Sequence, residues 1–395
     1  MLQRPERLAA PLARLATAAA VALGMAAGAR AQVSDWPIFR GDPALTGLAA
    51  GELPSAPELL WSFTAEKGIV SSPVVSAGLV LFGCDDGNVY ALDASSGEKR
   101  WTFKTQDVIE APPLVAQGSV FIGSSDGWLY ALELANGTLR WKQETGDKIL
   151  GGANLAHAAG EARVVVGSYD SNLYCFAAAD GTLRWKYSTE NYVNGTPAVH
   201  AGRIVFGGCD AVLHVVSAET GEALARIELG HDAHVAGSVA LAGERVYLGH
   251  YGNAFVCADL ARKELVWSVP DPKQPFFSSP ALAGERVVFG GRNKKLHCVR
   301  ASDGGELWTF ATRRKVDGSP IVVADEVVFG AADGRLHVLE LASGKERWSY
   351  DLGSDLGGSL AVAGGWIFAA TLDGRVSAFG PGSAPDESPR AEGER

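Results

Sequence analysis

The chain consists of short apolar runs separated by polar, turn-forming residues, and the runs recur at a nearly constant spacing. Successive runs end 40, 44, 40, 42, 41, 40 and 40 residues apart. A fixed period in this range indicates a repeat architecture whose units stack on one another. The runs end at Gly83, Gly123, Gly167, Gly207, Gly249, Gly290, Gly330 and, in the eighth copy, Ala370.

Each repeat contains four segments with the composition of β-strands. In the first repeat these are "SPVV" from Ser72, the run ending at Gly83, "NVYALDA" from Asn88, and "EKRWTF". Turn-forming pairs such as Asp86-Gly87 join them, because Gly adopts positive φ without steric cost. The strands are apolar on both faces, so each sheet must be covered on both sides. The sequence therefore predicts an all-β, eight-bladed β-propeller of four-stranded antiparallel blades.

The last repeat lacks a fourth strand. Strands are expected over 358–362, 366–370 and 375–379, after which the chain becomes polar and rich in Pro and Gly. An orphan copy of the fourth-strand motif, "ELLWSF" (58–63), precedes the first repeat. We predict that it completes blade eight and closes the ring. The predicted propeller is 58–380, with an approach segment at 32–57 and a disordered tail at 381–395.

The first 31 residues have the pattern of a cleavable signal peptide. A basic region precedes the apolar stretch Leu15–Ala27, and Ala29-Arg30-Ala31 has the small-x-small form of a cleavage site. The segment carries four Arg and one Glu, so its removal would change the net charge from −10 to −13. No Cys lies near the cleavage site, so the sequence gives no indication of N-terminal lipidation. We expect a periplasmic or secreted protein.

Charge and hydropathy exclude two classes of partner. A net charge of −10 argues against a general nucleic-acid binder, which would carry a basic stripe. After the signal peptide, no run approaches the roughly 20 apolar residues that a membrane-spanning helix needs. We expect neither a nucleic-acid partner nor a membrane span.

A recurring motif resembles the PQQ-like β-propeller superfamily. The stretch "ALDASSGEKRW" (91–101) has the pattern A-x-D-x-x-[ST]-G-x-x-x-W, and related stretches occur at 131–141, 175–185, 298–308 and 338–348. The segment "DWPIFRGDPALTG" (35–47) resembles the opening of many secreted proteins with these repeats. The superfamily includes quinone-dependent dehydrogenases and non-enzymatic propellers similar to the BamB-type outer-membrane assembly factor.

The Trp of this motif is interpreted as structural. The resemblance implies that its ring docks against the next blade, while small residues at the positions of Ala91 and Gly97 leave room for it. Two blades depart from the pattern, with Ala225 at the Trp position and Lys263 at the turn Gly. The expected docking residues are Trp61, Trp101, Trp141, Trp185, Trp267, Trp308 and Trp348.

Most Cys and His residues fall at repeat positions that indicate packing. Cys175, Cys257 and Cys298 align with Ala91, where a small buried residue is expected. His214, His297 and His337 align with Tyr90, a slot for a ring with a polar tip. The repeat gives no reason for Cys84.

Residues that break the repeat are better candidates for function. Loops entering the first strand and turns between the second and third strands share one face of a propeller, and six cations gather there. They could attract an anionic peptide, lipid head group or polymer, or be an ordinary solvated loop. They are Arg292, Lys294, Lys295, Arg313, Arg314 and Lys315.

A second candidate set is expected to form the rim of the central channel. These residues occupy one repeat position but vary in chemistry, so ligand specificity is expected there. Glu110, Asn194, Phe277 and Asp317 are the members chosen as binding candidates. The full set is Val70, Glu110, Leu150, Asn194, Ala236, Phe277, Asp317 and Gly357.

A weaker metal candidate lies in blade five. His231, Asp232, His234 and His250 are expected on one face and resemble a metal half-site. They lie in a predicted loop without a counterpart motif, so ordinary loop histidines are the favoured interpretation and no metal is predicted.

Three functions are compatible with these features. The favoured one is an exported, non-catalytic propeller that binds a protein or peptide partner, with a BamB-like role in envelope assembly. A quinoprotein alcohol or sugar dehydrogenase would need PQQ, calcium and a convergent carboxylate and amide set, and many members carry a Cys-Cys pair that is absent here. The third is a carbohydrate- or surface-polymer-binding protein. No cofactor is predicted under the favoured reading.

Overall fold

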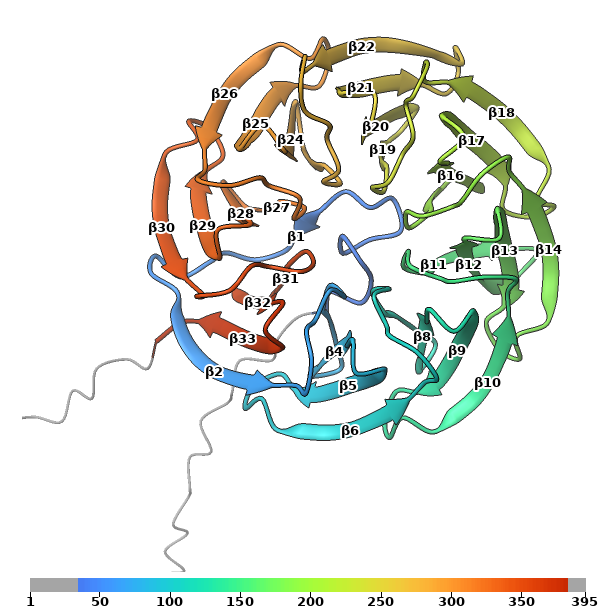
Figure 1. Ribbon diagram of the computed structural model, residues 1–395, viewed down its shortest axis with the longest axis horizontal. Helices are drawn as coiled ribbons and strands as arrows, with labels where there is room; N and C mark the ends of the chain where they lie inside the picture. Colours follow the sequence, from blue (N-terminus) through green and yellow to red (C-terminus); the bar gives the residue numbers. More distant parts are fainter. Residues whose placement is uncertain (1–34, 383–395) are drawn as a thin grey trace, which may run out of the picture. The chain divides into compact units, whose positions relative to one another are not determined.

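A computed structural model describes residues 35–382 of the chain. These residues form eight four-stranded antiparallel blades arranged radially around a central axis (Figure 1), and a short parallel strand is added to the sheet of blade seven. The predicted all-β, eight-bladed propeller is therefore confirmed. The predicted signal peptide and its cleavage site lie outside the described residues, as does the tail from residue 383. Within the described part of the chain, no helix is long and apolar enough to cross a membrane.

The strands of each blade are consecutive from the channel outward, except in blade eight. The innermost strands of blades one to eight are β3 (Val74–Ser76), β7 (Leu114–Ala116), β11 (Asn154–Ala158), β15 (Ala198–His200), β19 (Ala240–Ala242), β23 (Ala281–Ala283), β27 (Ile321–Val323) and β31 (Ala361–Ala363). The second strands are β4 (Leu79–Gly83), β8 (Ser119–Gly123), β12 (Glu161–Ser168), β16 (Arg203–Gly207), β20 (Arg245–His250), β24 (Arg286–Gly291), β28 (Glu326–Gly330) and β32 (Trp366–Ala370). The third strands are β5 (Asn88–Asp93), β9 (Trp128–Glu133), β13 (Asn172–Ala177), β17 (Val212–Ser217), β21 (Ala254–Asp259), β25 (Lys295–Arg300), β29 (Arg335–Glu340) and β33 (Arg375–Gly380). The outermost strands of blades one to seven are β6 (Lys99–Lys104), β10 (Leu139–Glu144), β14 (Leu183–Ser188), β18 (Ala223–Glu228), β22 (Glu264–Pro270), β26 (Glu306–Ala311) and β30 (Glu346–Asp351).

Burial follows the position of a strand within its blade. The second and third strands are almost wholly buried because neighbouring blades cover both of their faces. The outermost strand is largely exposed, as in β6, where Trp101 alone is buried. The prediction of strands apolar on both faces therefore holds for the interior of each blade and not for its edge.

The N-terminal strand closes the ring. β2 (Glu58–Thr64) pairs antiparallel with β33, from Glu58 opposite Gly380 to Thr64 opposite Arg375. Blade eight thus combines three C-terminal strands with one N-terminal strand, which confirms the predicted closure. Its innermost strand begins at Ala361 rather than at the expected residue 358, because Gly357, Gly358 and Ser359 line the channel.

In six of the eight blades, the docking Trp packs on the turn of the following blade. A Cβ placed on Gly137 would lie 2.5 Å from the Trp101 ring, and one on Gly97 would lie 2.6 Å from the Trp61 ring. The turn Gly therefore makes room for the Trp of the preceding blade, which corrects the expectation that Gly97 accommodates Trp101. Trp348 instead packs edge-on against Phe379. The indole N–H donates to a carbonyl of the next blade, at 2.9–3.2 Å, from Trp61, Trp101, Trp141, Trp185, Trp267 and Trp308.

The two departures from the motif are two halves of one interface. Blade four presents Ala225 where its Trp would stand, and blade five presents Lys263 where the Gly that receives that Trp would stand. Lys263 keeps the positive φ of the turn, at 60°, and its ammonium donates to the Leu224 carbonyl at 3.2 Å. A side chain at this turn is tolerated because the ring that would contact it is missing.

Restoring both halves of this contact should therefore be cooperative. Ala225→Trp alone should destabilise the fold or leave it unchanged, because the ring would meet the Lys263 side chain. Combined with Lys263→Gly, it should stabilise the fold, with a coupling free energy of about 1–3 kcal/mol in a double-mutant cycle. Chemical denaturation of the four proteins measures this value. Additive effects would show that the two positions do not form one contact.

A non-repeating segment fills one end of the channel. Residues 35–49 run through the centre of the ring (Figure 1), and β1 (Leu48–Ala49) pairs in parallel with β27. Trp36 exchanges two backbone hydrogen bonds with Val75 of blade one. Inner strands of blades two, four, five, six and seven donate backbone N–H groups, at 2.7–2.9 Å, to the carbonyls of Pro37, Pro43, Ala44, Thr46 and Gly47. Blades distant in sequence are thus tied to one central segment.

Arg40 anchors this central segment beneath blades six and seven. Its side chain is 1% exposed and donates to the carbonyls of Pro280, at 2.9 Å, and Pro320. Burial lowers the pKa of the guanidinium to about 9, against a smaller raising effect of Asp42, so it remains charged at neutral pH. A buried cation that bonds to two blades favours a single position of the segment in the channel.

Candidate functional site

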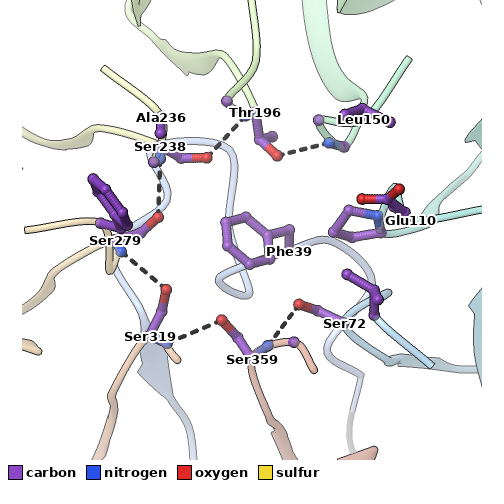
Figure 2. A pocket seen from close by; sticks show the side chains of 18 of the residues that line it. Phe39, Ser72, Glu110, Leu150, Thr196, Ala236, Ser238, Ser279, Ser319 and Ser359 are labelled. Carbon is purple, nitrogen blue, oxygen red and sulfur yellow. Dashed lines mark hydrogen bonds between the residues drawn. The ribbon is translucent and has the colours of Figure 1, made fainter. Parts of the chain in front are cut away.

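A funnel of about 400 Å³ occupies the other end of the channel. Its floor is the ring of Phe39, which lies at the centre of the blades (Figure 2). All eight residues of the predicted rim line it, including the four binding candidates Glu110, Asn194, Phe277 and Asp317. The repeat alignment therefore located the rim correctly. It did not predict that the N-terminal segment would close the funnel at its inner end.

A belt of hydroxyl groups surrounds Phe39 (Figure 2). Each hydroxyl accepts the backbone N–H of the corresponding residue in the preceding blade, at 2.8–3.1 Å. The bonds link blades three to eight and return to blade one, so they also hold the blades together around the channel. The belt residues are Thr196, Ser238, Ser279, Ser319, Ser359 and Ser72.

The belt is interrupted at blades two and three, beside Glu110. Pro112 and Gly152 occupy the belt positions there and provide no hydroxyl. Burial, followed by the nearby Asp85 carboxylate, raises the pKa of Glu110, while Lys148 opposes the shift. No ion pair joins Glu110 to any other described residue. It is therefore a carboxyl group at the funnel wall with free hydrogen-bonding capacity.

Asp317 lies in a different electrostatic environment from Glu110. Arg292 contacts both of its carboxylate oxygens, at 3.1 and 3.0 Å, and Lys315 adds a contact at 2.6 Å. The Arg292 guanidinium also lies 4.0 Å from the centre of the Phe277 ring, in cation–π geometry. Four of the predicted binding candidates thus form one cluster at the rim, in which two cations contact one carboxylate.

Aromatic side chains surround the funnel mouth on blades three to six. Tyr169 and Tyr192 are stacked with ring centres 4.7 Å apart, and Tyr251 lies 4.4 Å from Phe277. Tyr192 and Tyr251 are nearly half exposed. Tyr169 and Phe277 also line the funnel. The repeat alignment did not identify the three Tyr residues, which lie in loops outside the recurring slots.

The six candidate cations divide into two groups. Arg292 and Lys315 are bound to Asp317. Within residues 35–382, the other four form no ion pair, and all are exposed. Two of them, with Asp333 and Asp355, line a shallow groove of about 450 Å³ between blades seven and eight. The four free cations are Lys294, Lys295, Arg313 and Arg314.

The metal candidates in blade five do not converge. His231 and Asp232 contact each other at 2.8 Å and are strongly exposed, whereas the His234 ring contacts the carbonyl of Cys209. His250 is buried, and burial lowers its pKa. Among the described residues, no three His, Cys, Asp or Glu side chains are placed to hold a metal ion. The four residues thus do not form the half-site that their spacing resembles.

The packing interpretations of the His and Cys positions are confirmed. Tyr90 donates to Asp86 at 2.6 Å, and His214, in the same slot, contacts Asp210 at 3.0 Å. Cys175, Cys257 and Cys298 are buried and unpaired.

Cys84 also has a structural explanation. Its thiol contacts the carbonyls of Lys67 and Gly68 at 3.4 Å, as the Ser124 hydroxyl of blade two contacts the preceding loop.

The sequence matches a known family across the whole ring. Residues 55–156, 125–226 and 209–380 match the family described as outer membrane protein assembly factor BamB. The chain belongs to the BamB family. The three overlapping matches begin just before β2 and end in β33, so the family assignment includes the strands that close the ring.

Solved structures share the BamB-family propeller at low sequence identity. BamB from Moraxella catarrhalis is 19% identical, with a TM-score of 0.70 over 83% of this chain and 98% of that one. The computationally designed Ika8 protein is also 19% identical, with a TM-score of 0.72 over 82% of this chain and 100% of that one. Quinohemoprotein alcohol dehydrogenase from Comamonas testosteroni is 14% identical, with a TM-score of 0.75 over 89% of this chain and 82% of that one. These likenesses establish the fold alone. No curated protein gives a significant match.

The funnel of this BamB-family chain contains three of the side chain types that a quinone cofactor site would use. That cofactor and its calcium ion would need convergent carboxylate and amide side chains. Glu110, Asn194 and Asp317 line the same funnel, but Arg292 and Lys315 already bind Asp317. Of these three side chains, Glu110 and Asn194 thus remain without a bound cation in the described part of the channel.

Proposed function

We propose that this protein is an exported, non-catalytic propeller that binds an acidic segment of a protein partner in the cell envelope. The observation that carries the proposal is the group of four exposed cations on the mouth face of blades six and seven, none of which forms an ion pair with another of residues 35–382. They stand on a chain of net charge −10. Unpaired surface cations steer an anionic partner to one face and fix its orientation.

The BamB family supports a protein partner, because its described role is the assembly of outer-membrane proteins. The loops of the mouth face add exposed aromatic rings beside the cations, and aromatic residues with Arg are typical of protein interfaces. An acidic segment bound at blade seven would extend past Arg292 and Phe277 toward Tyr251.

The experiment is a crosslinking pull-down from envelope extracts with two charge-reversed variants of the full protein. The first replaces Lys294, Arg313 and Arg314 by Glu and should abolish recovery of the envelope partner. The matched control makes the same change at three exposed cations in or beside turns of the opposite face, one of which, Arg262, has an exposed ion pair with Glu264 at 3.8 Å, and it should retain the partner. The control residues are Lys99, Arg262 and Lys345.

Two further outcomes bear on this proposal. Binding through exposed charges should weaken as salt rises, because counterions screen such contacts beyond about 10 Å at 0.1 M. Equal recovery by both variants would contradict a cationic docking site. Reduction of a dye by the protein loaded with quinone and calcium, with alcohols or sugars as donors, would overturn the non-catalytic assignment.

A further inference from the structure

The hydroxyl belt has hydrogen-bonding capacity that the fold does not use. A hydroxyl has one donor and two acceptor lone pairs. Each belt hydroxyl uses one lone pair to accept a hydrogen bond from a backbone N–H. No described residue accepts the proton of any of the six. The belt side chains are at most 8% exposed, and all six residues line the funnel. Six donors and their remaining lone pairs are therefore available to whatever occupies it.

The charges of the lining disfavour an anionic occupant. No Lys or Arg is among the residues that line the funnel. Glu110 and Asp317 are its carboxyl side chains, and Asp317 is already paired at the rim with Arg292 and Lys315. An anion would meet the Glu110 carboxyl without a lining cation. A ligand hydroxyl can instead donate to Glu110, and Asn194 offers both a donor and an acceptor.

The funnel also offers flat apolar surfaces. Phe39 lies at its floor (Figure 2), and Tyr169 and Phe277 stand at its rim. The C–H face of a pyranose ring packs well on an aromatic ring, while its hydroxyls point outward around the ring edge. The volume of about 400 Å³ lies within the range of small-molecule sites.

We propose that the funnel binds a neutral saccharide of one or two units, with a sugar face on Phe39 and the sugar hydroxyls bonded to the Ser and Thr belt. A single amine or carboxylate would satisfy one or two of the six belt hydroxyls. A pyranose carries hydroxyls around its circumference and matches a circular set of donors and acceptors. Glu110 and Asn194, at and near the gap in the belt, would accept from or donate to the remaining sugar hydroxyls.

The first experiment measures binding of defined sugars to the full protein by calorimetry and saturation-transfer NMR. The probes are glucose, N-acetylglucosamine and maltose, with glucuronate as the anionic counterpart of glucose. A neutral sugar should bind, and glucuronate should bind about tenfold more weakly, a difference of about 1.4 kcal/mol. Preferred binding of glucuronate, or no binding by any neutral sugar, would overturn the proposal.

Variants place the sugar in the funnel. Ala236→Trp would fill the funnel without removing a belt hydroxyl and should abolish binding. The control Ala242→Trp makes the same change at an exposed position at the far end of the neighbouring strand β19, and should bind normally. Glu110→Ala should weaken binding about tenfold. Equal affinities for the two Trp variants would contradict a funnel site.

This site is separate from the proposed partner-binding surface, so the two can fail independently. The variant with Glu at positions 294, 313 and 314 should lose the envelope partner and keep its sugar affinity. Ala236→Trp should show the opposite pattern if the partner does not enter the funnel. Loss of sugar binding in the charge-reversed variant would show that the sugar lies on the cationic surface instead.

Discussion

Deleting residues 56–64 should lower the melting temperature of the propeller by about 10 °C or more. The deletion removes β2 and leaves β33 with an unpaired edge. It also removes Trp61, whose ring packs on Gly97 and whose N–H donates to the Ala94 carbonyl at 3.0 Å. Blade eight would thus lose both its outermost strand and its docking contact with blade one. Circular dichroism melts of the intact and shortened proteins measure the effect.

Two comparisons make this result specific to the closure of the ring. Glu58→Ala alters an exposed side chain of the same strand and should change stability by no more than about 0.5 kcal/mol. A peptide of residues 56–66 added to the shortened protein should restore part of the lost melting temperature by pairing with β33. An unchanged melting temperature after deletion would mean that β2 does not hold the ring together.

The fold could be predicted because every blade repeats the same physical requirement. Each repeat must bury two faces of a sheet, so apolar strands, Gly turns and docking Trp residues recur at the same positions. The last repeat lacks one strand and the chain contains one additional copy before the first repeat, so the closure of the ring could be predicted from the sequence. The coupling of Ala225 with Lys263 was missed because it joins different repeat positions in adjacent blades.

The interior of the channel could not be predicted in the same way. Residues 35–49 bind the blades through backbone carbonyls, which a residue of any type provides, so the sequence contains little trace of these contacts. Ser72, Ser279 and Ser319 each precede a recurring Pro, a visible signal. Their partners, however, are backbone N–H groups of neighbouring blades. Only the three-dimensional arrangement shows that these hydroxyls form a belt with unused protons.

Replacing Trp101 by Ala should destabilise the protein by about 3–5 kcal/mol. The ring is 8% exposed, and its N–H donates to the Leu134 carbonyl of the next blade at 3.0 Å. Truncation leaves a cavity between two blades that cannot collapse, because the blades are also held by the belt and by the closed ring. Equilibrium denaturation measures the loss of free energy.

The same contact can be tested from the side of the turn. Gly137→Ala places a methyl group 2.5 Å from the Trp101 ring at a φ of +73°, so it should cost more than the about 1–2 kcal/mol of a left-handed Ala alone. Gly118→Ala provides that baseline, because its φ is +70° and its nearest neighbour is a flexible Arg140 atom at 3.8 Å. In the Trp101→Ala background, the cost of Gly137→Ala should fall to the Gly118 value, since the ring it strikes is gone. If Gly137→Ala costs the same free energy in the Trp101→Ala background, then the positive φ alone requires Gly at this turn. The docking of Trp101 would then not depend on Gly137.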